Sequence, residues 1–83
     1  MPIEFDDAVI RQQIRAVADA TSTSDLASRF TDLYDEINAL DRHGKISDQQ
    51  WAQYHEALAA SRLAGWWNLE IAQQNAQAAP AAH

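Results

Sequence analysis

Three histidines are the residues whose chemistry could serve this chain in metal binding or general base catalysis. They are His43, His55 and His83, and His55 has no second histidine three or four positions away, the spacing that would place two ligands on one helix face. A zinc site needs three or four converging ligands, and the chain has no cysteine to supply them. The sequence also lacks the G-x-S-x-G, glycine-rich phosphate-loop and H-E-x-x-H motifs. We therefore expect no catalytic residue, no metal, no cofactor and no enzymatic activity.

The segment around Gly44 offers a partial match to an EF-hand calcium loop. When Gly44 is aligned with the invariant glycine of that loop, Ala39, Asp41, His43 and Gln50 fall on four of the ligand positions. Only Asp41 is a strong oxygen ligand for calcium. A helix that ends at a glycine, followed by the start of another helix, explains the same residues, so we expect no calcium site.

Composition favours a single all-α domain. The chain has 83 residues, too few for two cores, and two glycines and two prolines are too few for a fold rich in turns. The acidic N-terminal residues 1–7 contain no apolar segment of signal-peptide length, and no window approaches the roughly 18 apolar residues of a membrane span. Together with the absence of cysteine, these features predict a cytoplasmic protein that does not associate with membranes.

Charge argues against nucleic acid as a direct partner. The formal net charge is −6, from 12 acidic and 6 basic residues, and Lys45 is the only lysine. Binding to nucleic acid or anionic lipid depends on clustered lysine and arginine, and here the arginines are scattered. The expected partner is a protein.

Hydrophobic periodicity predicts three helices, at about 6–20, 25–42 and 48–75. They form one domain over 1–76, followed by a flexible tail over 77–83. The second helix has the clearest pattern, because its large apolar residues alternate in steps of four and three. These residues are Leu26, Phe30, Leu33, Ile37 and Leu40.

Helix-end signals support these boundaries. Asp6 suits the start of the first helix, and Ser22 or Ser24 the start of the second. Gly44 suits the left-handed position after the second helix, and Ser47 with Gln50 matches a capping box at the start of the third.

A short connection between the second and third helices predicts that they lie antiparallel. The third helix is the longer, at about 40 Å against about 27 Å, since each helical residue rises 1.5 Å. We therefore predict a three-helix bundle or a long antiparallel helical hairpin with an extended third helix. Gly65 leaves open whether the third helix kinks back or projects beyond the hairpin.

The third helix has two apolar faces. Its inward face is predicted to hold Trp51, Tyr54, Leu58, Gly65 and Leu69. A second stripe combines Leu63, Trp67 and Ile71 with Ala60 and Ala64, and Trp66 lies near the edge of the inward face.

Either the first helix or another molecule could cover this second stripe. Aromatic residues are enriched at the energetic centres of interfaces, which favours another molecule. We predict an interface formed by Leu63, Trp66, Trp67 and Ile71.

These observations predict a non-enzymatic protein–protein interaction module. In this hypothesis it is a homodimer that self-associates through the third helix and acts as a small adaptor or inhibitor of a larger protein. The alternative is an acidic inhibitor that mimics nucleic acid, of an anti-defence, antitoxin or immunity type from a phage or mobile element. Its contact residues would be Asp25, Asp32, Asp35, Glu36 and Asp41.

Overall fold

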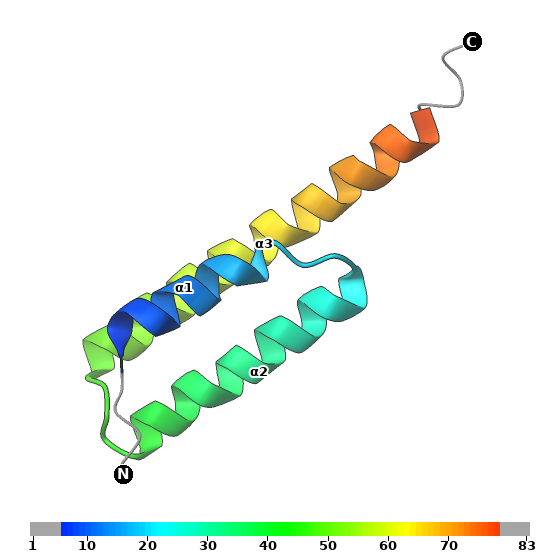
Figure 1. Cartoon of the computed structure of the whole chain (residues 1–83). Helices are drawn as coiled ribbons and strands as arrows, with labels where there is room; N and C mark the ends of the chain where they lie inside the picture. Colours follow the sequence, from blue (N-terminus) through cyan, green and yellow to red (C-terminus); the bar gives the residue numbers. More distant parts are fainter. Residues whose placement is uncertain (1–5, 79–83) are drawn as a thin grey trace.

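The protein is an all-α three-helix bundle with a long third helix, as the sequence predicts. A computed structural model describes residues 6–78 and forms α1 (Asp7–Val17), α2 (Thr23–Arg42) and α3 (Asp48–Ala78) (Figure 1). Within those residues there is no strand. The tail predicted over 77–83 lies mostly outside the described residues. The helix over 77–78 continues where the tail was expected to begin.

The connection between α1 and α2 differs slightly from the prediction. Asp6 caps α1, since its carboxylate accepts a 2.9 Å hydrogen bond from the amide of Ala8. The helix ends at Val17, three residues before the predicted end, because residues 18–20 form tighter turns with hydrogen bonds to the third preceding carbonyl. Ser22 caps α2 by accepting a 3.0 Å hydrogen bond from Asp25, so that helix starts at Thr23.

The connection between α2 and α3 follows the predicted end signals. Gly44 has a φ of 69°, the left-handed conformation that glycine adopts without strain. The amide of Lys45 donates to the carbonyl of Leu40 at 2.9 Å, which completes a Schellman motif. Ser47 and Gln50 form the reciprocal capping box, with hydrogen bonds of 2.8 and 3.1 Å. This short turn places α3 antiparallel to α2.

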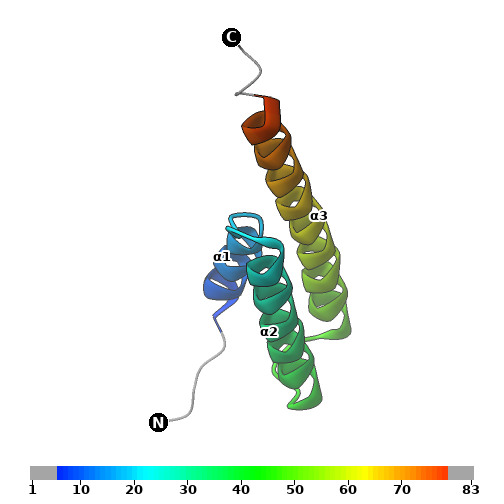
Figure 2. The ribbon, with the colours of Figure 1, turned by 90° about the vertical axis from the view of Figure 1, so that its right-hand side faces the viewer.

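Gly65 does not kink α3, which is one continuous helix of 31 residues. Instead, the glycine provides room for the end of α1. A β-carbon at Gly65 would lie 2.9 Å from Leu26 Cδ1, 3.1 Å from the carbonyl oxygen of Val17 and 3.3 Å from Ala18 Cα. Beyond this crossing, α3 extends past the rest of the bundle toward the C-terminus (Figures 1 and 2).

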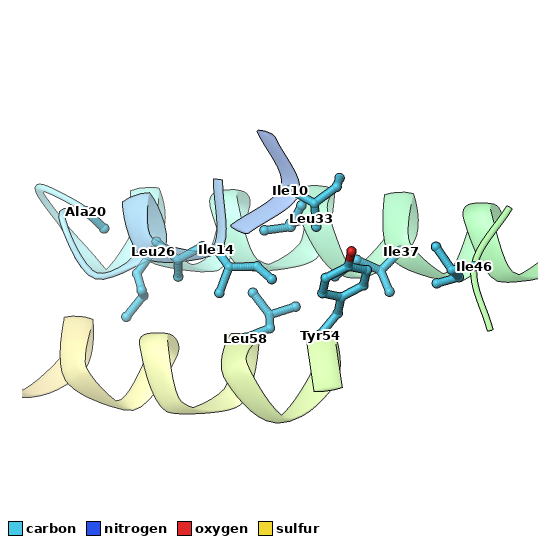
Figure 3. Packing of buried hydrophobic residues seen from close by; sticks show 10 residues of the cluster. Ile10, Ile14, Ala20, Leu26, Leu33, Ile37, Ile46, Tyr54 and Leu58 are labelled. Carbon is cyan, nitrogen blue, oxygen red and sulfur yellow. The ribbon is translucent and has the colours of Figure 1, made fainter. Parts of the chain in front are cut away.

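The core lies where all three helices meet (Figure 3). Among the side chains of α3 that the structure describes, the fully buried large ones are Tyr54 and Leu58. Trp51, predicted on the inward face, is 38% exposed, and its indole N–H instead donates to Asn38 at the edge of the bundle. The core residues are Ile10, Ile14, Val17, Ala20, Leu26, Leu33, Ile37, Ile46, Tyr54 and Leu58.

In the part of the chain that the structure describes, no helix combines the length and apolar character needed to cross a bilayer.

Candidate interaction surface

Four large apolar side chains of α3 are exposed on the half of the helix that follows the core. Leu63, Trp66, Trp67 and Ile71 have exposed fractions of 58, 45, 53 and 49%. Their spacing of three or four positions makes helical neighbours of Leu63 and Trp67, and of Trp67 and Ile71. The rings of Trp66 and Trp67 meet edge to face, with centroids 5.2 Å apart. We call these four residues the α3 apolar surface.

α1 does not cover this surface, because it packs on another side of α3. Three polar residues at seven-residue spacing, Tyr54, Ser61 and Asn68, attach α1 to α3. Ser61 Oγ donates to the carbonyl of Ile14 at 2.6 Å, and Asn68 Nδ2 donates to the carbonyl of Ala18 at 3.3 Å.

The third of these contacts links the other end of α1. The hydroxyl of Tyr54 donates to the carboxylate of Asp7. By helical geometry, Tyr54, Ser61 and Asn68 lie about 140°, 120° and 100° around α3 from Trp67, and the residues of the α3 apolar surface remain about half exposed. The alternative in which the first helix covers the second stripe is therefore wrong.

A groove between α2 and α3 continues the α3 apolar surface. It encloses about 830 Å³, and Leu63 and Trp66 form part of its wall on α3. From α2, Phe30 contributes a half-buried ring, and the guanidinium of Arg62 lies 4.5 Å from the centre of that ring. Such a cation–π contact holds the charged end of Arg62 over the groove without closing it. The remaining wall residues are Thr23, Leu26, Ala27, Thr31 and Ala59.

An aromatic cluster lies nearer the start of α3. Trp51 Nε1 donates to Asn38 Oδ1 at 3.0 Å, and His55 Nε2 lies 3.0 Å from the same oxygen. The His55 ring is also 4.4 Å from that of Trp51 and 4.9 Å from that of Tyr34. Burial lowers the pKa of His55, while the nearby charge of Asp41 acts in the opposite direction. The cluster is thus a packed, hydrogen-bonded contact between α2 and α3.

The acidic residues proposed for the alternative interface are divided in the structure. Asp25 accepts hydrogen bonds from Arg29 Nε at 3.1 Å and from the amide of Thr21 at 2.9 Å. The bond from Thr21 is the main cause of its lowered pKa. Asp41, whose charge acts to raise the pKa of His55, lies about 160° around α2 from Asp25.

The other three acids lie near α1 or in solvent. Asp32 and Glu36 line a 270 Å³ hollow between α1 and α2, which they share with Arg29. Asp35 is exposed. The five predicted residues therefore do not form one face: Asp25, Asp32 and Glu36 fall within about 40° around α2, whereas Asp41 is on the side of α3.

The groove is the feature that sequence reasoning missed. Phe30 belongs to the apolar seam predicted along α2, but its ring is only half-buried because it forms a wall of the groove. The signal that could have revealed the groove is the alignment of small Ala27 and Ala59 beside Phe30 and Trp66, since small residues between two helices leave a depression.

Comparison with protein-family models, with curated proteins and with solved structures yields no match to this chain. Within residues 6–78, no three or more histidine, aspartate or glutamate side chains are grouped so that they could hold a metal ion. The interpretation of function therefore depends on the surface itself.

Proposed function

We propose that this chain is a non-enzymatic protein–protein interaction module of the cytoplasm, which self-associates through the α3 apolar surface. Its role would be that of a small adaptor or inhibitor of a larger protein. One observation carries the proposal: Leu63, Trp66, Trp67 and Ile71 lie together and about half exposed, outside a core that is complete without them. A partner that covers them removes apolar surface from water, which is the main favourable contribution to most protein associations.

The size of the surface supports this proposal. A tryptophan, fully buried, removes about 150–250 Å² from water, so the two half-exposed tryptophans alone present about 200 Å². With Leu63 and Ile71 the total reaches about 400 Å², within the range of about 300–600 Å² for the largest and often functional patches on monomers. Singly exposed apolar residues are common on monomers, whereas patches of this size are often functional.

Trp67→Glu tests the proposal. A buried glutamate without a partner strongly disfavours an apolar interface, whereas the exposed position in the single chain should tolerate it. We expect light scattering to give a dimer mass for the wild type and a monomer mass for Trp67→Glu, with unchanged helical circular dichroism.

Val9→Glu is the matched control, because Val9 is 46% exposed on α1, away from the α3 apolar surface. It should remain dimeric. A wild type that is monomeric at high micromolar concentration would remove the self-association claim.

Acidic docking through α2 is the weaker proposal, because Asp25 is bonded within the chain and Asp41 lies apart. The two surfaces differ in their response to salt. Binding through Asp32, Asp35 and Glu36 should weaken steeply as salt rises, since exposed charges are screened. An association through Trp67 and Ile71 should hold or strengthen, because salt also screens the repulsion between two chains of net charge −6.

A further inference from the structure

We infer that the α3 helices of two copies pair antiparallel, so that the projecting end of each lies along the bundle half of the other. This inference rests on the proposed self-association and specifies its geometry. The pairing line runs through Ala60, Ala64, Trp67, Ile71 and Gln74, which follow one another at steps of four, three, four and three positions. That spacing is the seam of a two-helix contact. All five residues are exposed within the single chain.

Side-chain size along this line selects the antiparallel direction. The first half of the line holds the small residues Ala60 and Ala64, and the second half holds the large residues Trp67 and Ile71. In an antiparallel pair centred between Ala64 and Trp67, each large residue faces a small residue of the second copy. A parallel pair would set Trp67 against Trp67 and alanine against alanine, which crowds one half and leaves a gap in the other. Close-packed interfaces avoid both defects.

Charge favours the same direction. Contacts of Asn38 with Trp51 and of Leu26 with Gly65 set the level of α2 along α3. The acidic residues Asp32, Asp35 and Glu36 therefore lie level with the first half of α3, whereas Asp25 lies level with Gly65. A parallel pair would hold the two acidic bundles side by side, and like charges repel at short range. An antiparallel pair places the bundles toward opposite ends of the dimer.

The projecting end of α3 also favours an antiparallel pair. Residues 70–78 continue as helix beyond α1 and α2, as both ribbon views show (Figures 1 and 2). A short helical segment without tertiary packing is marginal in water. In the antiparallel pair, residues 70–78 lie opposite residues 53–61 of the second copy, and both segments gain a helix to pack against.

The surface area that a stable dimer buries requires pairing along most of α3. The four residues of the α3 apolar surface present about 400 Å², and a standard stable interface buries about 800 Å² per partner. A contact confined to the two tryptophans would fall far short. Pairing over residues 53–78 adds Ala60, Ala64 and the flanking polar residues, and it extends along about 39 Å of helix.

A single spin label tests the direction, because the chain has no cysteine of its own. Ala52→Cys places a label on an exposed residue near the start of α3, at the side of the pairing line. In the antiparallel pair, the two labels are separated by twice their offset from the centre, about 40 Å along the axis. In a parallel pair they would be separated only by the width of two helices and the linkers, within about 20 Å, since helix axes pack 8–10 Å apart.

We expect pulsed electron paramagnetic resonance to give a distance distribution centred near 40 Å. The signal should vanish when Trp67→Glu is added to the labelled chain. A short distance in a sample that light scattering shows to be dimeric would overturn the antiparallel inference and leave self-association standing. A labelled chain that scatters as a monomer, like an unlabelled wild-type control, would overturn both.

Discussion

At the scale of single residues, Gly65 decides how closely α1 can approach α3. Its missing side chain leaves room for Leu26 and for the backbone at Val17 and Ala18. Hydrophobic periodicity alone placed Gly65 correctly on the inward face, but it could not show that the glycine serves packing instead of a bend. That role depends on where the end of α1 crosses, which is a tertiary contact.

Gly65→Ala should therefore destabilise the protein. Overpacking costs about 1–3 kcal/mol, which exceeds or cancels the gain of about 1 kcal/mol that alanine brings to a helix interior. Two of the three close neighbours are backbone atoms, which cannot move aside as a side-chain tip can. Urea unfolding should show a net loss of about 1 kcal/mol.

Gly44→Ala is a useful comparison, because Gly44 has open space for a β-carbon and only its φ of 69° opposes the change. It should lose stability through strain alone. A Gly65→Ala protein that is more stable than the wild type would contradict the packing role of this glycine.

Tyr54 and Asp7 give the fold a predictable response to pH. Burial and the hydrogen bond to Asp7 raise the pKa of Tyr54 to about 12, from an ordinary value of 10.0. The same hydrogen bond is the main cause of the lowered pKa of Asp7. A raised pKa in the folded state means that stability is fully present below pH 10 and declines as the pH rises toward 12.

Tyr54→Phe should reduce this alkaline decline. The variant should be less stable at pH 8, because Asp7 loses a hydrogen-bond donor, but its free energy of unfolding should change less between pH 9 and pH 11.5. Urea unfolding at several pH values measures both effects. An equal alkaline decline in the wild type and in Tyr54→Phe would show that other groups cause it.

At the scale of helices, the sequence signals located each element well and erred chiefly at the C-terminal ends of α1 and α3. The capping box of Ser47 and Gln50 and the left-handed Gly44 are local, so they could be recognised without a structure. The end of α1 at Val17 was missed, because the following residues Ala18, Asp19 and Ala20 have no strong stop signal. Those three residues are compatible both with a continued α-helix and with the tighter turns that they form.

The projecting end of α3 should report on association through its amide exchange. We expect residues 70–78 to exchange hydrogen quickly in the monomeric Trp67→Glu variant, because this segment lies beyond the bundle. In the wild-type dimer, the same amides should be protected. The core half of α3 around Tyr54 and Leu58 serves as the internal reference and should exchange slowly in both proteins. Equal, rapid exchange of residues 70–78 in both would contradict their placement in the interface.

At the scale of the whole molecule, the sequence predicted a second apolar stripe on α3. It could not decide whether α1 or another molecule covers that stripe. The residues that attach α1 to α3 are Tyr54, Ser61 and Asn68, and two of them are small polar residues that hydrophobic periodicity ignores. Ser61 donates to the backbone of Ile14 in α1, and Asn68 donates to the backbone of Ala18 just after it; these contacts become visible only in three dimensions. The groove beside Phe30 escaped prediction for a similar reason, since it depends on the spacing between two helices.

The central claim is that the α3 apolar surface is covered by a second copy of the chain. Sedimentation of the wild type from about 1 to 200 μM tests it most directly, because interfaces near the small end of the stable range associate with micromolar dissociation constants. We predict a reversible rise in mass from the 9.3 kDa chain to twice that value within this range. A mass that stays at 9.3 kDa throughout would contradict the claim.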